Sequence, residues 1–257
     1  MLASVDGCKT GWVVALSESW PPSGEPYLCV CRDFCTVLKV TGRCAAVVID
    51  IPIGLPSGTE VRLCDSQARD LLGKEGRSRL FLAPPRESFT ADSPEEFQKL
   101  HTRARGKGAG WPVWGILSRL KEADAQMSQE LQKRVREFHP ELTWKRLAGQ
   151  TLPSKHHKDG IEARIQMLER VLSGLGNVQS WASSLGRAAK SDDLLDAIVG
   201  LSAVDCIQRE GGSQFRLPSG KSQDDEKCLR MEIWYSIGAH LLEMNSGGPR
   251  GYWAGGG

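Results

Sequence analysis

Acidic residues fall at three places where a strand or helix of the chain would meet solvent. Asp6 ends the apolar run LASVD, Asp50 ends the run AAVVID, and Asp193 and Asp196 open the apolar segment SDDLLDAIVGLSA. Mg²⁺ and Mn²⁺ are hard cations that prefer carboxylate oxygens. Asp193 and Asp196 are three residues apart and therefore share one face of a helix, whereas Asp192 points elsewhere. Gathered in one crevice, these acids would repel one another, and a divalent cation would relieve that repulsion.

Each acid also has an ordinary structural explanation. An Asp-Gly pair such as Asp6-Gly7 is typical of a turn. Asp192 and Asp193 would suit the positively polarised start of a helix. Asp196 is harder to explain, because its apolar neighbours indicate a helix that is packed nearly all round, where an acid needs a partner or a metal. Glu137, at the end of the short segment VREF, is a further candidate ligand.

The elements that must position these acids follow from the spacing of apolar residues. LASVD, TGWVVALS and YLCVCRDF predict three strands in a meander, AAVVID predicts a buried fourth strand, and VREF predicts a short fifth. LRMEIWY predicts a late edge strand or hairpin arm. Helical spacing covers residues 60–72, 94–105, 112–134, 160–172 and 191–210. We therefore expect an α/β fold with a mixed sheet and helices on both faces.

Length and composition limit the classes of protein to consider. The 257 residues allow one large domain, which we place at residues 1–245, followed by a mobile Gly-rich tail at 246–257. The net charge of +2 is too small to indicate a nucleic-acid partner by itself. No apolar run approaches the ~20 residues needed to cross a bilayer. Eight cysteines without a signal peptide favour reduced thiols, so we expect a cytoplasmic protein with no membrane partner.

The chain resembles domain-of-unknown-function family 429, a bacterial and archaeal family of predicted RNase H-like nucleases. The resemblance covers about residues 5–203 and rests on segments that occur in order: SVDGCKTGWVVA, VVIDIPIGLP, RLCDSQAR, RLFLAPPR, EFHPELTWKRLAG, the lysine of LPSKHHKDGIEAR, and SDDLLDAIVGLSA. It implies an RNase H-like fold, whose mixed five-stranded sheet begins with three antiparallel strands and has its fourth and fifth strands parallel to the first. Helices cover both faces of that sheet.

The resemblance also implies residue roles. In the wider superfamily, which includes the Holliday-junction resolvases, acids on the first strand, the fourth strand and a late helix bind two divalent metals. These catalytic and metal-binding roles fall on Asp6, Asp50, Asp193 and Asp196, with Asp6 bridging both ions. We thus expect a nuclease that hydrolyses phosphodiester bonds with two Mg²⁺ or Mn²⁺ ions.

Basic residues within the matching segments are candidates for substrate binding. Arg86 and Lys155 lie in such segments, away from regular amphipathic helices. Residues of this type usually contact the phosphates of a nucleic acid. The resemblance therefore implies that Arg86 and Lys155 bind a nucleic-acid substrate.

Two other classes of function stay open. The turn Asp6-Gly7-x-x-x-Gly11 would suit a phosphate-binding hairpin, as in a nucleotide-binding phosphotransferase or an ATPase-like protein. Those enzymes duplicate the fold, and this chain is too short for two copies. The other alternative is a non-catalytic RNase H-like module that uses a charged crevice to bind a protein or nucleotide.

Overall fold

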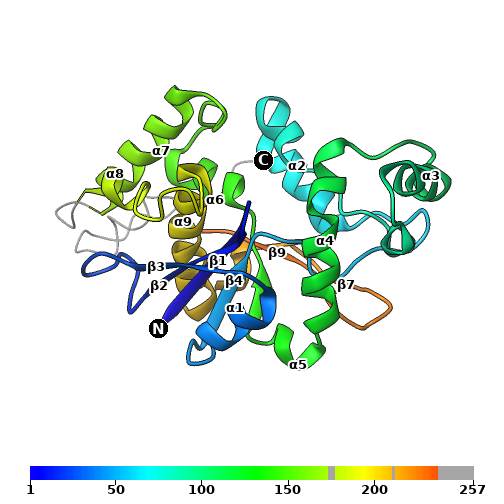
Figure 1. Cartoon of the computed structure of the whole chain (residues 1–257), viewed down its shortest axis with the longest axis horizontal. Helices are drawn as coiled ribbons and strands as arrows, with labels where there is room; N and C mark the ends of the chain where they lie inside the picture. The colour runs from blue at the N-terminus through cyan, green and yellow to red at the C-terminus, as the bar shows by residue number, and fades with distance from the viewer. Residues whose placement is uncertain (173–176, 210–211, 237–257) are drawn as a thin grey trace, which may run out of the picture.

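The centre of the protein is a mixed five-stranded sheet in the order β3-β2-β1-β4-β5 (Figure 1). The structure is a computed structural model that describes residues 1–172, 177–209 and 212–236; the tail expected at 246–257 lies outside the described residues. β1 pairs antiparallel with β2, and β2 with β3, whereas β4 is parallel to both β1 and β5. The expected α/β fold with a mixed sheet is confirmed. The strands are β1 (Leu2–Cys8), β2 (Gly11–Ser17), β3 (Tyr27–Cys31), β4 (Ala46–Ile49) and β5 (Val135–Glu137).

Helices cover both faces of this sheet and divide its apolar residues between two cores. Alternation along β1 directs Leu2 and Cys8 to one face, against α9 (Ser191–Gln208), and Ala3 and Val5 to the other. The second face packs against α1 (Phe34–Val40) and α4 (Trp111–Gln126). Figure 1 shows α7 and α8 beside α9 at one end of the molecule and α3 beyond α4 at the other. The further helices and 3-10 turns are α2 (Leu63–Gly76), η1 (Arg77–Arg79), η2 (Arg86–Thr90), α3 (Pro94–Arg105), α5 (Gln129–Gln132), α6 (Pro140–Ala148), α7 (Lys158–Val171), α8 (Val178–Trp181) and η3 (Gly212–Phe215).

Two predicted elements are shorter than expected because a capping residue starts a new helix. The third strand ends at Cys31, and the Asp33 carboxylate then accepts the backbone N–H of Thr36 at the start of α1. The helix expected at 112–134 ends at Gln126, where the Ser128 hydroxyl caps α5 in the same way. In both places local side-chain caps ended an element that apolar spacing alone would have continued.

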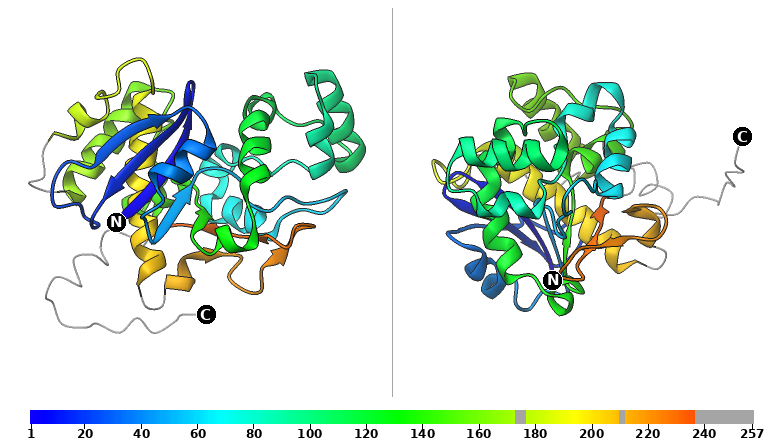
Figure 2. Two further views of the ribbon diagram at one scale, coloured as in Figure 1. Left: turned by 60° about the horizontal axis from the view of Figure 1, so that its bottom comes forward. Right: turned by 90° about the vertical axis from the view of Figure 1, so that its right-hand side faces the viewer.

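The segment LRMEIWY forms the expected hairpin arms after the main sheet. β8 (Arg230–Met231) pairs with β7 (Gln223–Asp224), and β9 (Ile233–Trp234) pairs with β6 (Arg216–Leu217). β9 lies beside β5, where Trp234 forms a bridge with Phe138. The orange C-terminal strands lie apart from the blue strands β2 and β3 (Figure 2). Among the described residues, no helix combines the length and apolarity that crossing a bilayer requires.

Gly200 allows α9 to lie very close to the sheet. A Cβ atom at this position would stand 2.0 Å from Ser4 Oγ and 2.6 Å from the ring of Phe138. Ser4 and Asp6 share one face of β1, and Asp196 lies one helical turn before Gly200. The close approach at Gly200 therefore brings Asp196 toward Asp6.

Replacing Gly200 by alanine should lower the free energy of unfolding by about 1–3 kcal/mol, the usual cost of overpacking a core. Chemical denaturation of the wild type and the variant measures this change. Gly115→Ala is the matched control, because apart from neighbouring residues of its own helix no described atom lies within 4 Å of the added Cβ. That helical substitution should instead stabilise the protein by about 0.5–1 kcal/mol. Equal effects of the two substitutions would contradict the close packing at Gly200.

Candidate functional site

Asp6 and Asp50 lie side by side at the ends of adjacent parallel strands. The register pairs Val5 with Ile49, and the backbone N–H of Asp50 continues the ladder by donating to the carbonyl of Val5. Asp6 is only 5% exposed, and its Oδ1 accepts the backbone N–H of Gly7 at 2.8 Å. The two carboxyl groups therefore meet at the strand ends, where open α/β sheets bind their ligands.

Asp196 reaches the same place from α9. Its side chain is fully buried, and both of its oxygens accept short hydrogen bonds. Oδ1 accepts the indole N–H of Trp144 at 2.6 Å, and Oδ2 accepts from the ammonium group of Lys155 at 2.6 Å. The sequence alone had predicted that a buried Asp196 needs a partner or a metal, and these two donors are its partners.

The electrostatics agree with a close cluster of Asp6, Asp50 and Asp196, which we call the acidic pocket. Burial, followed by the negative charges of Asp50 and Asp196, raises the pKa of Asp6 well above its ordinary value of 3.8. Burial raises the pKa of Asp50 to about 7, against the opposing charge of Lys155. The pKa of the Lys155 ammonium group is raised, and the negative charge of Asp196 is the largest cause. When all three acids are ionised, their negative charges outnumber the single positive charge of Lys155.

Asp192 and Asp193 lie in the first turn of α9, close to this acidic pocket. The backbone N–H of Lys190 donates to Asp193 Oδ2 at 3.1 Å, so Asp193 takes part in capping α9. Burial raises the pKa of Asp193, and its charge in turn contributes to the raised pKa of Asp6. Asp192 was expected to point elsewhere, but its Oδ2 lies 4.0 Å from the Lys155 ammonium.

Glu137 lies in a different cluster. Glu137 is two residues after Val135 in β5, so the two side chains point to the same face of the sheet. Val135 packs in the core on the face opposite α9. The Glu137 carboxylate accepts from Arg62 Nη2 at 2.7 Å and from the backbone N–H of Ile53 at 2.7 Å. The structure therefore does not bring Glu137 together with Asp6, and we leave it out of the proposed ligand set.

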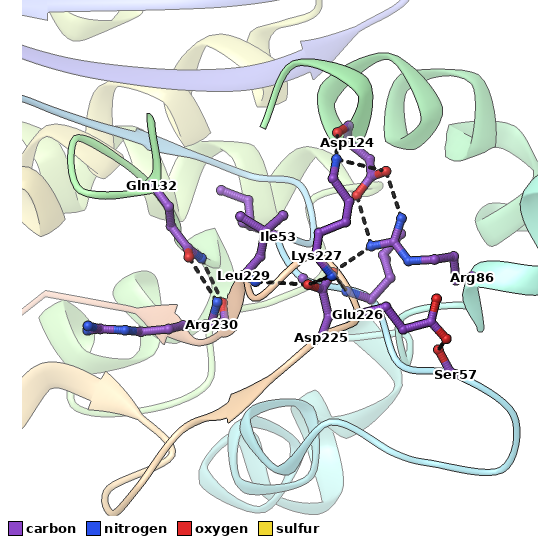
Figure 3. A network of polar contacts seen from close by, with 12 residues as sticks. Ile53, Ser57, Arg86, Asp124, Gln132, Asp225, Glu226, Lys227, Leu229 and Arg230 are labelled. Carbon is purple, nitrogen blue, oxygen red and sulfur yellow. Dashed lines mark hydrogen bonds and ion pairs between the residues drawn. The ribbon is translucent and has the colours of Figure 1, made fainter. Parts of the chain in front are cut away.

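Arg86 is held in a network of its own. Its guanidinium lies between Asp124 on α4 and Asp225 in the loop before β8 (Figure 3). Asp225 also accepts the backbone N–H groups of Leu55 and Leu229. With both terminal nitrogens bonded to carboxylates, Arg86 ties α4 to the C-terminal hairpins, and its role in substrate binding stays a prediction.

Three residues that sequence reasoning did not assign surround the acidic pocket. Trp144 binds Asp196, and the buried guanidinium of Arg164 lies 5.7 Å from the Trp144 ring. Burial lowers the pKa of His139 to about 4, so its imidazole is neutral at pH 7. The segment EFHPELTW carries His139 and Trp144 directly after the fifth strand. The available signals were the position of this segment at the end of a strand and its place among the segments of the family resemblance.

The donor set of the pocket fits a hard divalent cation. Asp6 and Asp50 offer only oxygen ligands, and when both are ionised their adjacent negative charges would attract a cation. Across the described residues, no group of three or more His, Cys, Asp or Glu side chains lies close enough together to hold a metal ion. Mg²⁺ is commonly bound by only one or two carboxylates and keeps several water ligands, so an adjacent carboxylate pair suits it.

The raised pKa of Asp50 predicts how stability depends on pH. The folded state holds the Asp50 proton more tightly than the unfolded state. The stabilising contribution of Asp50 to the free energy of unfolding is therefore full below pH 4 and is lost as the pH rises toward about 7. In EDTA, Asp50→Asn should therefore melt about 2–4 °C above the wild type at pH 8, which corresponds to about 1 kcal/mol. The difference should shrink toward pH 4. The control Asp70→Asn, at a position 71% exposed, should show no such trend; a difference for Asp50→Asn that is constant with pH would contradict the assignment.

A comparison with known families places this chain among its relatives. A family model described as "Protein of unknown function (DUF429)" matches residues 5–219. The chain belongs to this family. The DUF429 region begins next to Asp6 and ends after α9, so it contains every acidic residue of the pocket. No curated protein and no solved structure matches the chain.

Proposed function

We propose that this DUF429 protein is a divalent-metal-dependent nuclease with an RNase H-like fold, which hydrolyses phosphodiester bonds. The observation that carries the proposal is the meeting of Asp6, Asp50 and Asp196 where β1, β4 and α9 come together beside a single lysine. The strand order β3-β2-β1-β4-β5, with a late acidic helix against β1, supports the same conclusion. These elements are the ones that the family resemblance assigns to the metal site.

Asp6 and Asp50 would hold the metal ion. Their carboxyl groups lie on adjacent strands, and the Gly7 N–H orients one oxygen of Asp6. A divalent ion bound there would supply an activated water and positive charge for the leaving oxygen. The chain contributes the strand ends that keep the two carboxylates together and the buried wall of α9 that limits access of bulk water.

Exposed cations around the pocket support a polyanionic substrate. The hydroxyl of Thr10 donates to the carbonyl of Ala188 at 2.7 Å, which joins the β1–β2 turn to the segment before α9. These segments and the start of α7 carry exposed basic side chains, and such side chains supply the phosphate contacts of nucleic-acid binding. They are Lys9, Arg187, Lys190 and Lys158.

The proposal is tested by incubating the protein with labelled single-stranded, duplex and branched DNA and RNA. Cleavage is expected with Mg²⁺ or Mn²⁺ and should stop when EDTA is added. Absence of metal-dependent cleavage across the whole set would contradict the proposal. ATP hydrolysis together with thermal stabilisation by ATP would favour the phosphotransferase alternative instead.

A further inference from the structure

Lys155 places a positive charge inside the acidic pocket. Its ammonium group lies 2.6 Å from Asp196 Oδ2 and 4.0 Å from Asp192 Oδ2, and the side chain is 28% exposed. The same charge acts on Asp6 and Asp50. Lys155 is therefore a neighbour of all the acids that the family resemblance assigns to metal binding on strands β1 and β4 and helix α9.

The backbone that carries Lys155 is tightly held. At Gly160, in the first turn of α7, an added Cβ would stand 2.0 Å from the carbonyl oxygen of Ser154, so the loop packs directly on the helix. The buried guanidinium of Arg164 donates to the carbonyl groups of Pro153 and Gly160 at 2.9 and 2.8 Å. These contacts fix the residues that precede Lys155, and the ammonium group is preorganised on Asp196.

Both carboxylate oxygens of Asp196 have a partner in this arrangement. Trp144 donates to one oxygen and Lys155 to the other, each at 2.6 Å. An ion bound to Asp196 Oδ2 would lie beside the Lys155 ammonium group, and the two positive charges would repel each other. Asp6 and Asp50, by contrast, receive no side-chain ion pair among the described residues.

The charges in the pocket point to the same division of roles. Asp6, Asp50 and Asp196 carry three negative charges when ionised, whereas Asp193 is compensated by its bond at the start of α9. One ammonium group and one divalent ion together carry three positive charges. A second divalent ion beside Lys155 would leave the buried pocket with excess positive charge, which is costly in a region of low dielectric constant.

We propose that the ammonium group of Lys155 occupies one of the two cation positions of the pocket, so that Asp196 binds the lysine and Asp6 and Asp50 hold a single divalent ion. This inference rests on the proposed function, because it concerns the same metal site. It differs from the two-ion expectation that the family resemblance implies. Lys155 and Asp196 are thus positioning residues, and Asp6 and Asp50 are the ligands.

Mn²⁺ binding by isothermal titration calorimetry and electron paramagnetic resonance tests the inference without substrate. The wild type should bind one Mn²⁺ per chain, and Lys155→Met, which frees Asp196, should bind two. Asp196→Asn should keep one Mn²⁺ with affinity within about threefold, whereas Asp6→Asn should lose it. The exposed control Asp70→Asn should leave the count at one. Circular dichroism checks that each variant is folded.

Each outcome separates the inference from the proposed function. Two Mn²⁺ ions in the wild type, or loss of Mn²⁺ binding in Asp196→Asn equal to that in Asp6→Asn, would overturn the lysine's role and leave the nuclease proposal standing. No Mn²⁺ binding to the wild type would overturn the metal site itself and the inference with it. If Lys155→Met does not fold, the wild-type count and the Asp196→Asn result decide the question.

Discussion

Asp6→Asn is expected to lower metal-dependent cleavage of nucleic acid by more than about 100-fold. Replacing even a group that only supports a metal ligand costs about 10–100-fold, and Asp6 is the most buried carboxylate on the strand side of the pocket. An amide keeps the shape of the side chain but removes the charge that attracts the ion. Initial rates of cleavage at saturating Mn²⁺ measure the loss.

Two controls distinguish this effect from unfolding. Asp6→Asn should melt no lower than the wild type in EDTA, because the substitution removes a repelled charge from the pocket. Asp70→Asn changes an exposed aspartate on α2 and should retain full activity. Wild-type cleavage by Asp6→Asn would refute the assignment of Asp6 as a metal ligand.

Arg62→Met is expected to lower the free energy of unfolding by about 3–5 kcal/mol, the usual cost of removing one partner from a buried ion pair. Arg62 is 0% exposed and pairs with Glu137 at 2.7 Å and with Asp65 at 3.1 Å. It also donates to the carbonyl of Gly54, in the loop that follows Asp50. The substitution therefore leaves two buried carboxylates without a cation and loosens the loop beside the pocket. Urea denaturation measures the loss.

The surface pair of Arg77 and Asp70 provides the matched control. Its atoms are 3.7 Å apart and both side chains are more than half exposed, so Arg77→Met should cost less than about 1 kcal/mol. The double variant Arg62→Met, Glu137→Gln should lose less free energy of unfolding than the two single variants lose when their losses are added. The reason is that the second substitution removes one of the carboxylates that Arg62→Met leaves unpaired. Similar losses for Arg62→Met and Arg77→Met would contradict the buried network.

Local sequence was sufficient to predict the elements that carry the pocket. The apolar runs ending at Asp6 and Asp50 form adjacent parallel strands, and the long apolar segment that contains Asp196 forms α9. These elements are strongly apolar and bounded by turn residues, so packing and local preference agree. The short helix α1 was missed, because the capping interaction of Asp33 outweighed the strand-like alternation before it.

Which acids share the pocket depended on long-range geometry. Asp6 and Glu137 both stand near the ends of strands in the sequence, but side chains alternate between the faces of a sheet. Every second residue of a strand faces α9, and the others face the opposite core. The packing of the whole sheet decides which set a given residue belongs to. Glu137 thus meets Arg62 on the opposite face, at a sequence separation of 75 residues.

The partners of the charged groups were likewise decided by the tertiary structure alone. The sequence by itself determined that Asp196 is a buried acid on an apolar helix, but Lys155 and Trp144 reach it from segments 41 and 52 residues away. Arg86, which the family resemblance assigns to substrate binding, forms ion pairs with Asp124 and Asp225 that the sequence did not predict. Residue type and spacing establish which groups carry charge; the chain's three-dimensional path establishes which opposite charge each one meets, because a buried charge is stable only where packing supplies its partner.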